Sequence, residues 1–216
     1  MSTQKVNIPK LGLFLGLVAA IASGLLSVVY ASTKEGIAIN QQKKTNAALE
    51  QLLPAFDNVP GTDAKTIDAP SGWPVTFYIG RMGDQIVGYA GEVVSPEGFS
   101  GDVTVMVGLR ADGSVRKVIV TQQTETPGLG TAITDRKIRK TIADLINGAA
   151  EAVGLPPNAY LDQYDGRKSE GTAWEVVKDG GDVDAKTGAT ITSRAVCGAV
   201  YAVSATCVEH LEELKD

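Results

Sequence analysis

The feature that most constrains the fold of this 216-residue chain is an uninterrupted run of 23 residues, residues 11–33. No side chain in this run is charged at neutral pH. As an α-helix the run would be roughly 35 Å long, enough to cross a hydrocarbon core of about 30 Å. The alternative is a cleaved signal peptide, with Val29-Tyr30-Ala31 as a tolerable cleavage site. The apolar stretch of such a peptide is only about 7–15 residues long, however. We therefore predict a single-pass anchor over residues 11–33, preceded by a short tail, residues 1–10.

Small residues recur every four positions along this anchor and would share one helix face: Gly12, Gly16, Ala20 and Gly24. Such a face lets another membrane helix approach closely. Because Gly and Ala are common in membrane helices in general, the stripe favours a membrane partner without establishing one. Lysines lie on both sides of the anchor, so the positive-inside rule does not decide its orientation.

The charge balance excludes several classes of function. The chain has 20 basic and 25 acidic residues; because Lys5 and Lys10 precede the anchor, 18 basic and 25 acidic residues follow it, a formal charge of −7. No basic field exists to hold nucleic acid, so we expect no nucleic-acid partner. One His and two Cys argue against a zinc or iron–sulfur site built from this chain alone.

The rest of the chain predicts an α+β domain. Residues 34–74 are expected to form a helix and a linker: a helix over 41–53 with an apolar patch, stopped by Pro54, then a loop over 54–73. Runs rich in Val, Ile and aromatic residues predict four strands, at 75–79, 85–94, 103–110 and 115–121. Ala111-Asp112-Gly113 predicts a tight hairpin. A meander with helices before and after it is α+β rather than a Rossmann-type alternation.

Two glycine-containing segments follow the strands. Residues 125–130, Glu-Thr-Pro-Gly-Leu-Gly, form either a plain connection to a helix over 135–147 or a loop whose backbone approaches a ligand. Residues 184–193 lead into a helix predicted over 190–214. Small, hydroxyl-rich residues at a helix start suit a phosphate site, and they equally suit an ordinary Ser or Thr N-cap.

These two segments carry a resemblance to a known family. Residues 184–190, Asp-Ala-Lys-Thr-Gly-Ala-Thr, are similar to the Asp-x-x-Ser/Thr-Gly-Ala-Thr motif at which flavin transferases attach FMN covalently. Residues 125–130 are similar to the companion loop of the same FMN-binding domain. With one N-terminal membrane helix before them, the motifs resemble those of the RnfG/NqrC family. Its members belong to Rnf electron-transport complexes (RnfG) and to sodium-pumping NADH:quinone reductases (NqrC).

The resemblance implies that Thr190 carries FMN through a phosphoester between its Oγ and the terminal phosphate of the flavin. A separate flavin transferase would form this bond and would recognise the other motif residues, Asp184, Thr187, Gly188 and Ala189. The isoalloxazine would be lined by the companion loop, through Glu125, Thr126, Gly128 and Leu129. Thr190 is then an attachment point, and no catalytic residue is expected.

The family also implies a role and a place in the cell. The chain would be an electron-transfer subunit without turnover of its own, in a translocase that couples electron flow between ferredoxin and NAD to ion translocation. Its partners would be the membrane and iron–sulfur subunits of that complex, the flavin transferase and membrane lipid. The tail would be cytoplasmic, and the FMN-binding domain, residues 75–216, would lie on the outer, periplasmic face of the inner membrane.

Two alternatives to this function remain. One is the NqrC subunit of the sodium-translocating NADH:quinone reductase, and the other is a membrane-tethered module that binds a phosphorylated ligand noncovalently. The coupling ion, the flavin potential and the immediate electron donor and acceptor stay open.

The two cysteines are expected to be packing residues. Cys197 and Cys207 are ten positions apart on one predicted helix. On a continuous helix they would lie about 15 Å apart, whereas a disulfide needs Cα atoms within roughly 7 Å. We therefore expect no bridge between them.

Overall fold

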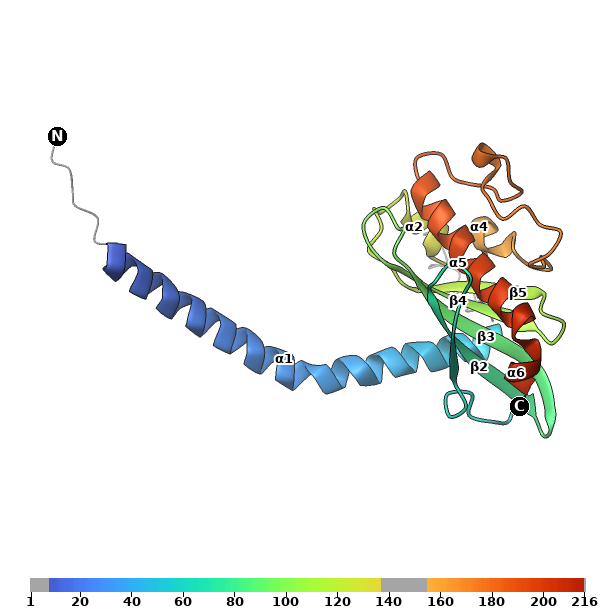
Figure 1. The fold of residues 1–216 in the computed structure, drawn as a ribbon, viewed down its shortest axis with the longest axis horizontal. Coiled ribbons are helices and arrows are strands. Elements are labelled where there is room, and N and C mark those ends of the chain that lie inside the picture. Colours follow the sequence, from blue (N-terminus) through green and yellow to red (C-terminus); the bar gives the residue numbers. More distant parts are fainter. Residues whose placement is uncertain (1–7, 137–154, 216) are drawn as a thin grey trace, which may run out of the picture. The chain divides into compact units, whose positions relative to one another are not determined.

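The structure is a computed structural model that describes residues 8–136 and 155–215 (Figure 1). The chain divides into two compact units, Met1–Lys44 and Thr45–Asp216. The second unit includes residues 45–74 together with the expected FMN-binding domain. The expected helix over 135–147 lies outside the described residues except for Asp135 and Arg136, which are not helical.

Helix α1 (Ile8–Leu52) joins the expected anchor and the expected helix over 41–53 into one element of 45 residues. We expected two separate segments, but residues 34–40 contain no proline and only one glycine, Gly36, so nothing in them stops a helix. Pro9 is tolerated because it lies in the first turn, where its missing N–H has no intrahelical acceptor. The apolar side chains of residues 8–39 are exposed, as a lipid-facing helix requires.

Five strands form one antiparallel sheet in chain order (Figure 1). They are β1 (Lys65–Asp68), β2 (Pro74–Met82), β3 (Gln85–Ser95), β4 (Val103–Arg110) and β5 (Val115–Gln122). The four predicted strands and the α+β class are confirmed. The hairpin between β4 and β5 is confirmed as well, with Gly113 at φ 79° and its N–H donating to the carbonyl oxygen of Arg110.

Strand β1 corrects the prediction that residues 54–73 form only a loop. Its four residues are partly or fully exposed and do not alternate apolar and polar side chains strongly enough to predict a strand. It pairs with the edge of β2, and the hydroxyls of Thr66 and Thr76 lie 3.0 Å apart across the pair. Free N–H and C=O groups on an edge strand attract such a pairing partner.

The sheet is covered on both faces. Helix α5 (Thr190–Glu209) packs on one face and buries Val196, Val200 and Val203 against strands β2, β3 and β4. The last turns of α1 pack on the other face through Ala48, Leu49 and Leu52, and Leu53 directly after the helix packs with them against Ala90 and Met106. The approach is close: a Cβ on Gly108 would lie 2.6 Å from the carbonyl oxygen of Leu52.

The C-terminal helix is shorter than predicted. It stops at Glu209, and α6 (Leu211–Lys215) follows after His210. Val208, on the last turn of α5, is 40% exposed. Cys197 and Cys207 both lie on the continuous α5 and are free and buried, which confirms that they do not bridge. Among the described residues two helices are long and apolar enough to cross a membrane, α1 and α5; because α5 is mostly buried against the sheet, it is a core helix.

Candidate functional site

The segment before α5 makes a tight turn that delivers Thr190 to the helix start. The N–H of Ala189 donates to the carbonyl oxygen of Lys186 at 2.9 Å, and Gly188 has φ 85°. Glycine in the left-handed region at the third position is typical of a type II turn. A side chain at residue 188 would therefore strain the backbone, which is a local reason for the glycine of this motif.

Helix α5 begins without a side-chain cap. Its N-cap residue is Ala189, and no side chain accepts a hydrogen bond there, so the expected alternative of a Ser or Thr N-cap is wrong. Ser193 donates its N–H to the carbonyl oxygen of Ala189, whereas the N–H groups of residues 190–192 have no acceptor within the helix. These groups and the helix dipole favour negative charge near the start of α5. Among the described residues the Thr190 hydroxyl has no hydrogen-bond partner.

The companion loop also contains a tight turn. Leu129 donates its N–H to the carbonyl oxygen of Thr126 at 3.2 Å. Pro127 is the second residue of this turn and Gly128, with φ 79°, is the third. Proline followed by a positive-φ glycine is the sequence signature of a type II turn. The short helix α2 (Thr131–Thr134) follows at once. Leu129 is thereby held at the tip of the loop, 44% exposed.

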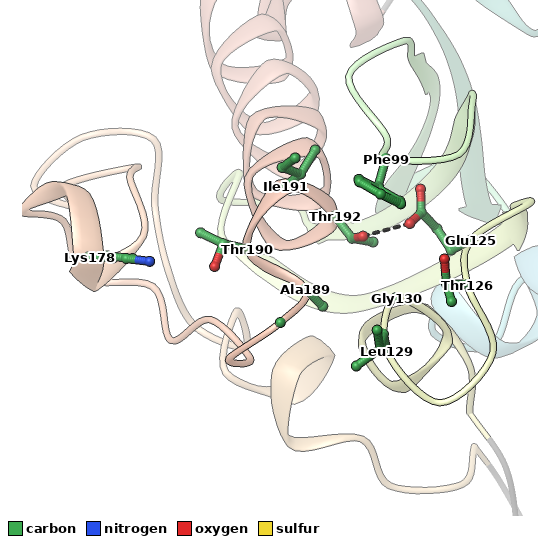
Figure 2. A pocket seen from close by; sticks show the side chains of 11 residues that line it. Phe99, Glu125, Thr126, Leu129, Gly130, Lys178, Ala189, Thr190, Ile191 and Thr192 are labelled. Atoms are coloured by element: carbon green, nitrogen blue, oxygen red, sulfur yellow. Dashed lines mark hydrogen bonds between the residues drawn. The ribbon is translucent and has the colours of Figure 1, made fainter.

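The fold brings the two motifs together although about 60 residues separate them. The Lys186 ammonium donates to the carbonyl oxygen of Gly128 at 2.8 Å. The Thr192 hydroxyl, on the first turn of α5, donates to Glu125 Oε2 at 2.7 Å. Figure 2 shows this second bond between α5 and the companion loop.

An open cavity of about 340 Å³ lies between the motifs (Figure 2). This is within the range of about 300–1,000 Å³ that is usual for small-molecule sites. Six of the nine expected site residues line it: Glu125, Thr126, Leu129, Gly188, Ala189 and Thr190. The other three do not. Asp184 is exposed and its backbone is hydrogen-bonded to the Gln163 side chain, Thr187 is exposed, and Gly128 borders a neighbouring cavity.

Five further residues line the cavity that the sequence did not predict: Phe99, Gly130, Lys178, Ile191 and Thr192. Gly130 is the last residue of the companion loop, and Ile191 and Thr192 follow residues 184–190 in the chain, so proximity to the motifs was a usable signal. Phe99 comes from the loop between β3 and β4, and Lys178 from the 3-10 helix η1 (Val177–Asp179). Neither belongs to a motif, so only the tertiary structure could find them.

Lys178 gives the cavity a positive charge. Figure 2 shows its side chain extending toward Thr190, and within the described part of the chain its ammonium group has neither a hydrogen-bond nor an ion-pair partner. Next to it, Asp179 forms a two-pronged ion pair with Arg194 of α5, at 2.6 and 2.7 Å. Hydrogen bonding to the guanidinium lowers the pKa of the Asp179 carboxyl. This pair ties η1 to the first turns of α5.

Metal chemistry finds no support in the described ranges, 8–136 and 155–215, where no three His, Cys, Asp or Glu residues group to hold a metal ion. Burial raises the pKa of Cys197 to about 11 and that of Cys207 to about 12, so both thiols are protonated at neutral pH. His210 is engaged by Glu213, with Nδ1 and Oε2 3.0 Å apart.

Two family models match parts of this chain. Residues 98–204 match the family model of the FMN-binding domain and include every residue that lines the cavity. Residues 1–52, which contain all of α1, match the model of the RnfG N-terminal region. The chain therefore contains an FMN-binding domain attached to an N-terminal apolar helix.

Individual relatives cover nearly the whole chain. The G subunit of the ion-translocating oxidoreductase complex of Pseudoalteromonas atlantica is 36% identical over 91% of this chain and 86% of its own length. The protein of the same name from Cronobacter sakazakii is 37% identical over 90% of this chain and 87% of its own, and that from Escherichia coli is 34% identical over 90% and 88%. The chain belongs to this family, the G subunits of ion-translocating oxidoreductase complexes.

Proposed function

We propose that this chain is the FMN-binding electron-transfer subunit of an ion-translocating oxidoreductase complex, and that Thr190 carries the FMN covalently through a phosphoester. One observation carries the second part: the Thr190 hydroxyl has no hydrogen-bond partner in the described structure and lies at an uncapped helix start, on a cavity that both motifs line. The FMN-binding domain match and the relatives' names support the first part.

The residues present fit the chemistry of FMN. A phosphate on Thr190 would meet the N–H groups of the α5 start and the ammonium of Lys178, both suited to negative charge. The isoalloxazine would lie in the cavity against the apolar side chains of Phe99, Leu129 and Ile191. When bound, the flavin supplies reversible electron transfer, while the chain supplies position and electrostatics.

The site supports attachment by a separate flavin transferase rather than self-modification. Glu125 is the single acidic residue among those that line the cavity, and its carboxylate is hydrogen-bonded to the Ser100 N–H and the Thr192 hydroxyl. No base therefore contacts Thr190 within the described structure. The exposed turn with Asp184 and Thr187 remains accessible to a modifying enzyme, which would read residues 184–190.

We propose the same membrane arrangement that was expected from the sequence. Residues 11–33 would span the inner membrane in contact with lipid, residues 1–10 would be cytoplasmic, and the FMN-binding domain would lie on the periplasmic face. The exposed apolar side chains of α1 support the span, and the family resemblance supports the orientation. The other membrane and iron–sulfur subunits of the complex would be its partners, in electron flow between ferredoxin and NAD.

Mass spectrometry tests the covalent bond. The full chain is co-expressed with a flavin transferase and should gain the mass of one FMN minus one water. Trypsin cleaves after Lys186 and Arg194, so the added mass should fall on residues 187–194, Thr-Gly-Ala-Thr-Ile-Thr-Ser-Arg. This peptide holds four hydroxyl residues, of which one is Thr190. The variants Thr190→Val and Thr190→Ser therefore identify the site.

Thr190→Val should abolish the added mass and the in-gel flavin fluorescence, whereas Thr190→Ser should retain both because it keeps a hydroxyl at the same position. Thr192→Ser is the matched control, because it changes a neighbouring hydroxyl residue and should leave attachment intact. An unmodified Thr190 in protein purified from its native membrane would refute the covalent bond. A flavin that leaves the band on denaturation would instead support noncovalent binding.

A further inference from the structure

The carboxylate of Glu125 is buried in the wall of the cavity, with the whole residue only 5% exposed. Oε1 accepts a hydrogen bond from the N–H of Ser100 at 3.2 Å, in the loop between β3 and β4. Oε2 accepts one from the Thr192 hydroxyl at 2.7 Å, on the first turn of α5. One side chain of the companion loop thus holds two other segments of the site.

Two glycines lie close against this carboxylate. A Cβ on Gly98 would lie 2.8 Å from Oε1, and a Cβ on Gly130 would lie 2.5 Å from Oε2. Both distances are far below ordinary van der Waals contact, so glycine at each position makes room for the carboxylate. Thr192 is itself 1% exposed, which keeps water away from its hydrogen bond.

We infer that Thr192 is a positioning residue for the flavin: by holding the Glu125 carboxylate, it fixes the turn that carries Leu129 against the helix start that carries Thr190. The inference rests on the proposed function. A hydrogen bond to a buried carboxylate is among the stronger ones in proteins, because one partner is charged and water cannot compete. The flavin's two contacts, at its phosphate and at its ring, are thereby held in one geometry.

Removing the Thr192 hydroxyl has a defined consequence. Thr192→Val keeps the shape of the side chain and leaves Oε2 without its donor in a buried place, which is unfavourable for a charged group. The carboxylate then turns toward the cavity to reach water and takes the 126–130 turn with it. Thr192 lies outside residues 184–190, so recognition by the transferase stays intact.

The test uses the full chain co-expressed with a flavin transferase and purified in detergent, as wild type, Thr192→Val, Thr192→Ser and Glu125→Gln. Covalent FMN is quantified by mass spectrometry. The order of the bound flavin is measured by its visible circular dichroism and fluorescence anisotropy, and its midpoint potential by redox titration. Far-UV circular dichroism and thermal unfolding report whether each variant is folded.

Thr192→Val should carry as much covalent FMN as wild type but lose most of the flavin ellipticity and anisotropy. Thr192→Ser should retain both, because it keeps the donor. Glu125→Gln should also retain them, since the amide can pair with both Ser100 and Thr192, while its potential shifts upward because a negative charge is gone from the cavity wall. This combination separates positioning from charge.

Two results would overturn the inference. One is a flavinylated Thr192→Val whose flavin signals equal those of wild type; the other is a folded Glu125→Gln that loses the ellipticity. If Thr192→Val does not fold, the test rests on Glu125→Gln. Loss of the flavin ellipticity in this variant, when it is folded, would then overturn the inference. A wild-type chain without covalent FMN would instead refute the proposed function, so the two failures are distinguishable.

Discussion

The ammonium group of Lys186 donates a hydrogen bond of 2.8 Å to the carbonyl oxygen of Gly128, which joins two loops that are 58 residues apart in the chain. Lys186→Met keeps the aliphatic part of the side chain and removes this bond. We expect a loss of about 0.5–1.5 kcal/mol in the free energy of unfolding, the usual range for one hydrogen bond. Hydrogen exchange of residues 126–130 should become faster.

Lys168→Met is the control for the lost charge. Lys168 is 59% exposed and pairs with Asp112 at 3.3 Å. An exposed ion pair of this kind contributes little to stability. The variant should therefore leave hydrogen exchange of residues 126–130 unchanged. Equal protection of this loop in wild type and Lys186→Met would show that the bond does not hold the two motifs together.

Gly188→Ala tests the turn before α5. Residue 188 has φ 85°, and its Cβ would lie 3.4 Å from Leu129 Cδ2. An L side chain in this left-handed region is strained by roughly 1–2 kcal/mol. We expect lower stability by about that amount and less covalent FMN, measured by chemical unfolding and intact mass.

Gly198→Ala, in the middle of α5, is the control for this backbone argument. Its Cβ would meet only an ordinary contact, 3.6 Å from Trp73. Alanine is also favoured over glycine inside a helix, so the variant should be neutral or stabilising. Similar behaviour of the two variants would contradict the backbone argument.

The two cysteines should resist alkylation in the native protein. Cys197 is 2% and Cys207 0% exposed, and burial raises the pKa of their thiols to about 11 and about 12. At pH 8 about one Cys197 in a thousand would be a thiolate, which is the reactive form. Iodoacetamide should therefore label neither residue before urea is added and both afterwards. Ser71→Cys, at an exposed site, provides the positive control, and native labelling of Cys197 would refute its burial.

The hairpin between β4 and β5 makes stability depend on pH. Hydrogen bonds from the hydroxyl and the N–H of Ser114 lower the pKa of Asp112 to about 2, from an ordinary 3.8. Because the folded-state pKa is depressed, this stabilisation is present above pH 4 and is lost as the pH falls toward 2. The Asp112 side chain is 56% exposed. Solvent screening therefore keeps the effect below about 1 kcal/mol.

Ser114→Ala should raise the pKa of Asp112 toward its ordinary value, as followed by a carboxyl NMR titration. Wild type should exceed the variant in unfolding free energy at neutral pH, and the difference should shrink between pH 4 and pH 2. A constant difference across this range would show that the hydroxyl acts through packing and not through the charge of Asp112.

Local patterns determined much of the fold. The uncharged run at residues 11–33 predicts a membrane helix because length and hydrophobicity alone decide whether a segment can cross a bilayer. The strands at 85–94 and 103–110 were found because Val, Ile and aromatic side chains favour a pleated, buried surface. Strand β1 was missed because its formation depends on the free edge of β2 and not on its own four residues.

For the candidate site too, some residues could be predicted from the sequence and others only from the tertiary structure. The sequence by itself determined the two motifs, because each is a contiguous string whose turns require glycine at a defined position, and the family resemblance of these motifs implied Thr190 as the expected attachment point. Only the tertiary structure decided that Phe99 and Lys178 share the cavity, and that Glu125 is held by Thr192. These relationships join residues far apart in the chain, and their geometry exists only once α5 has packed on the sheet.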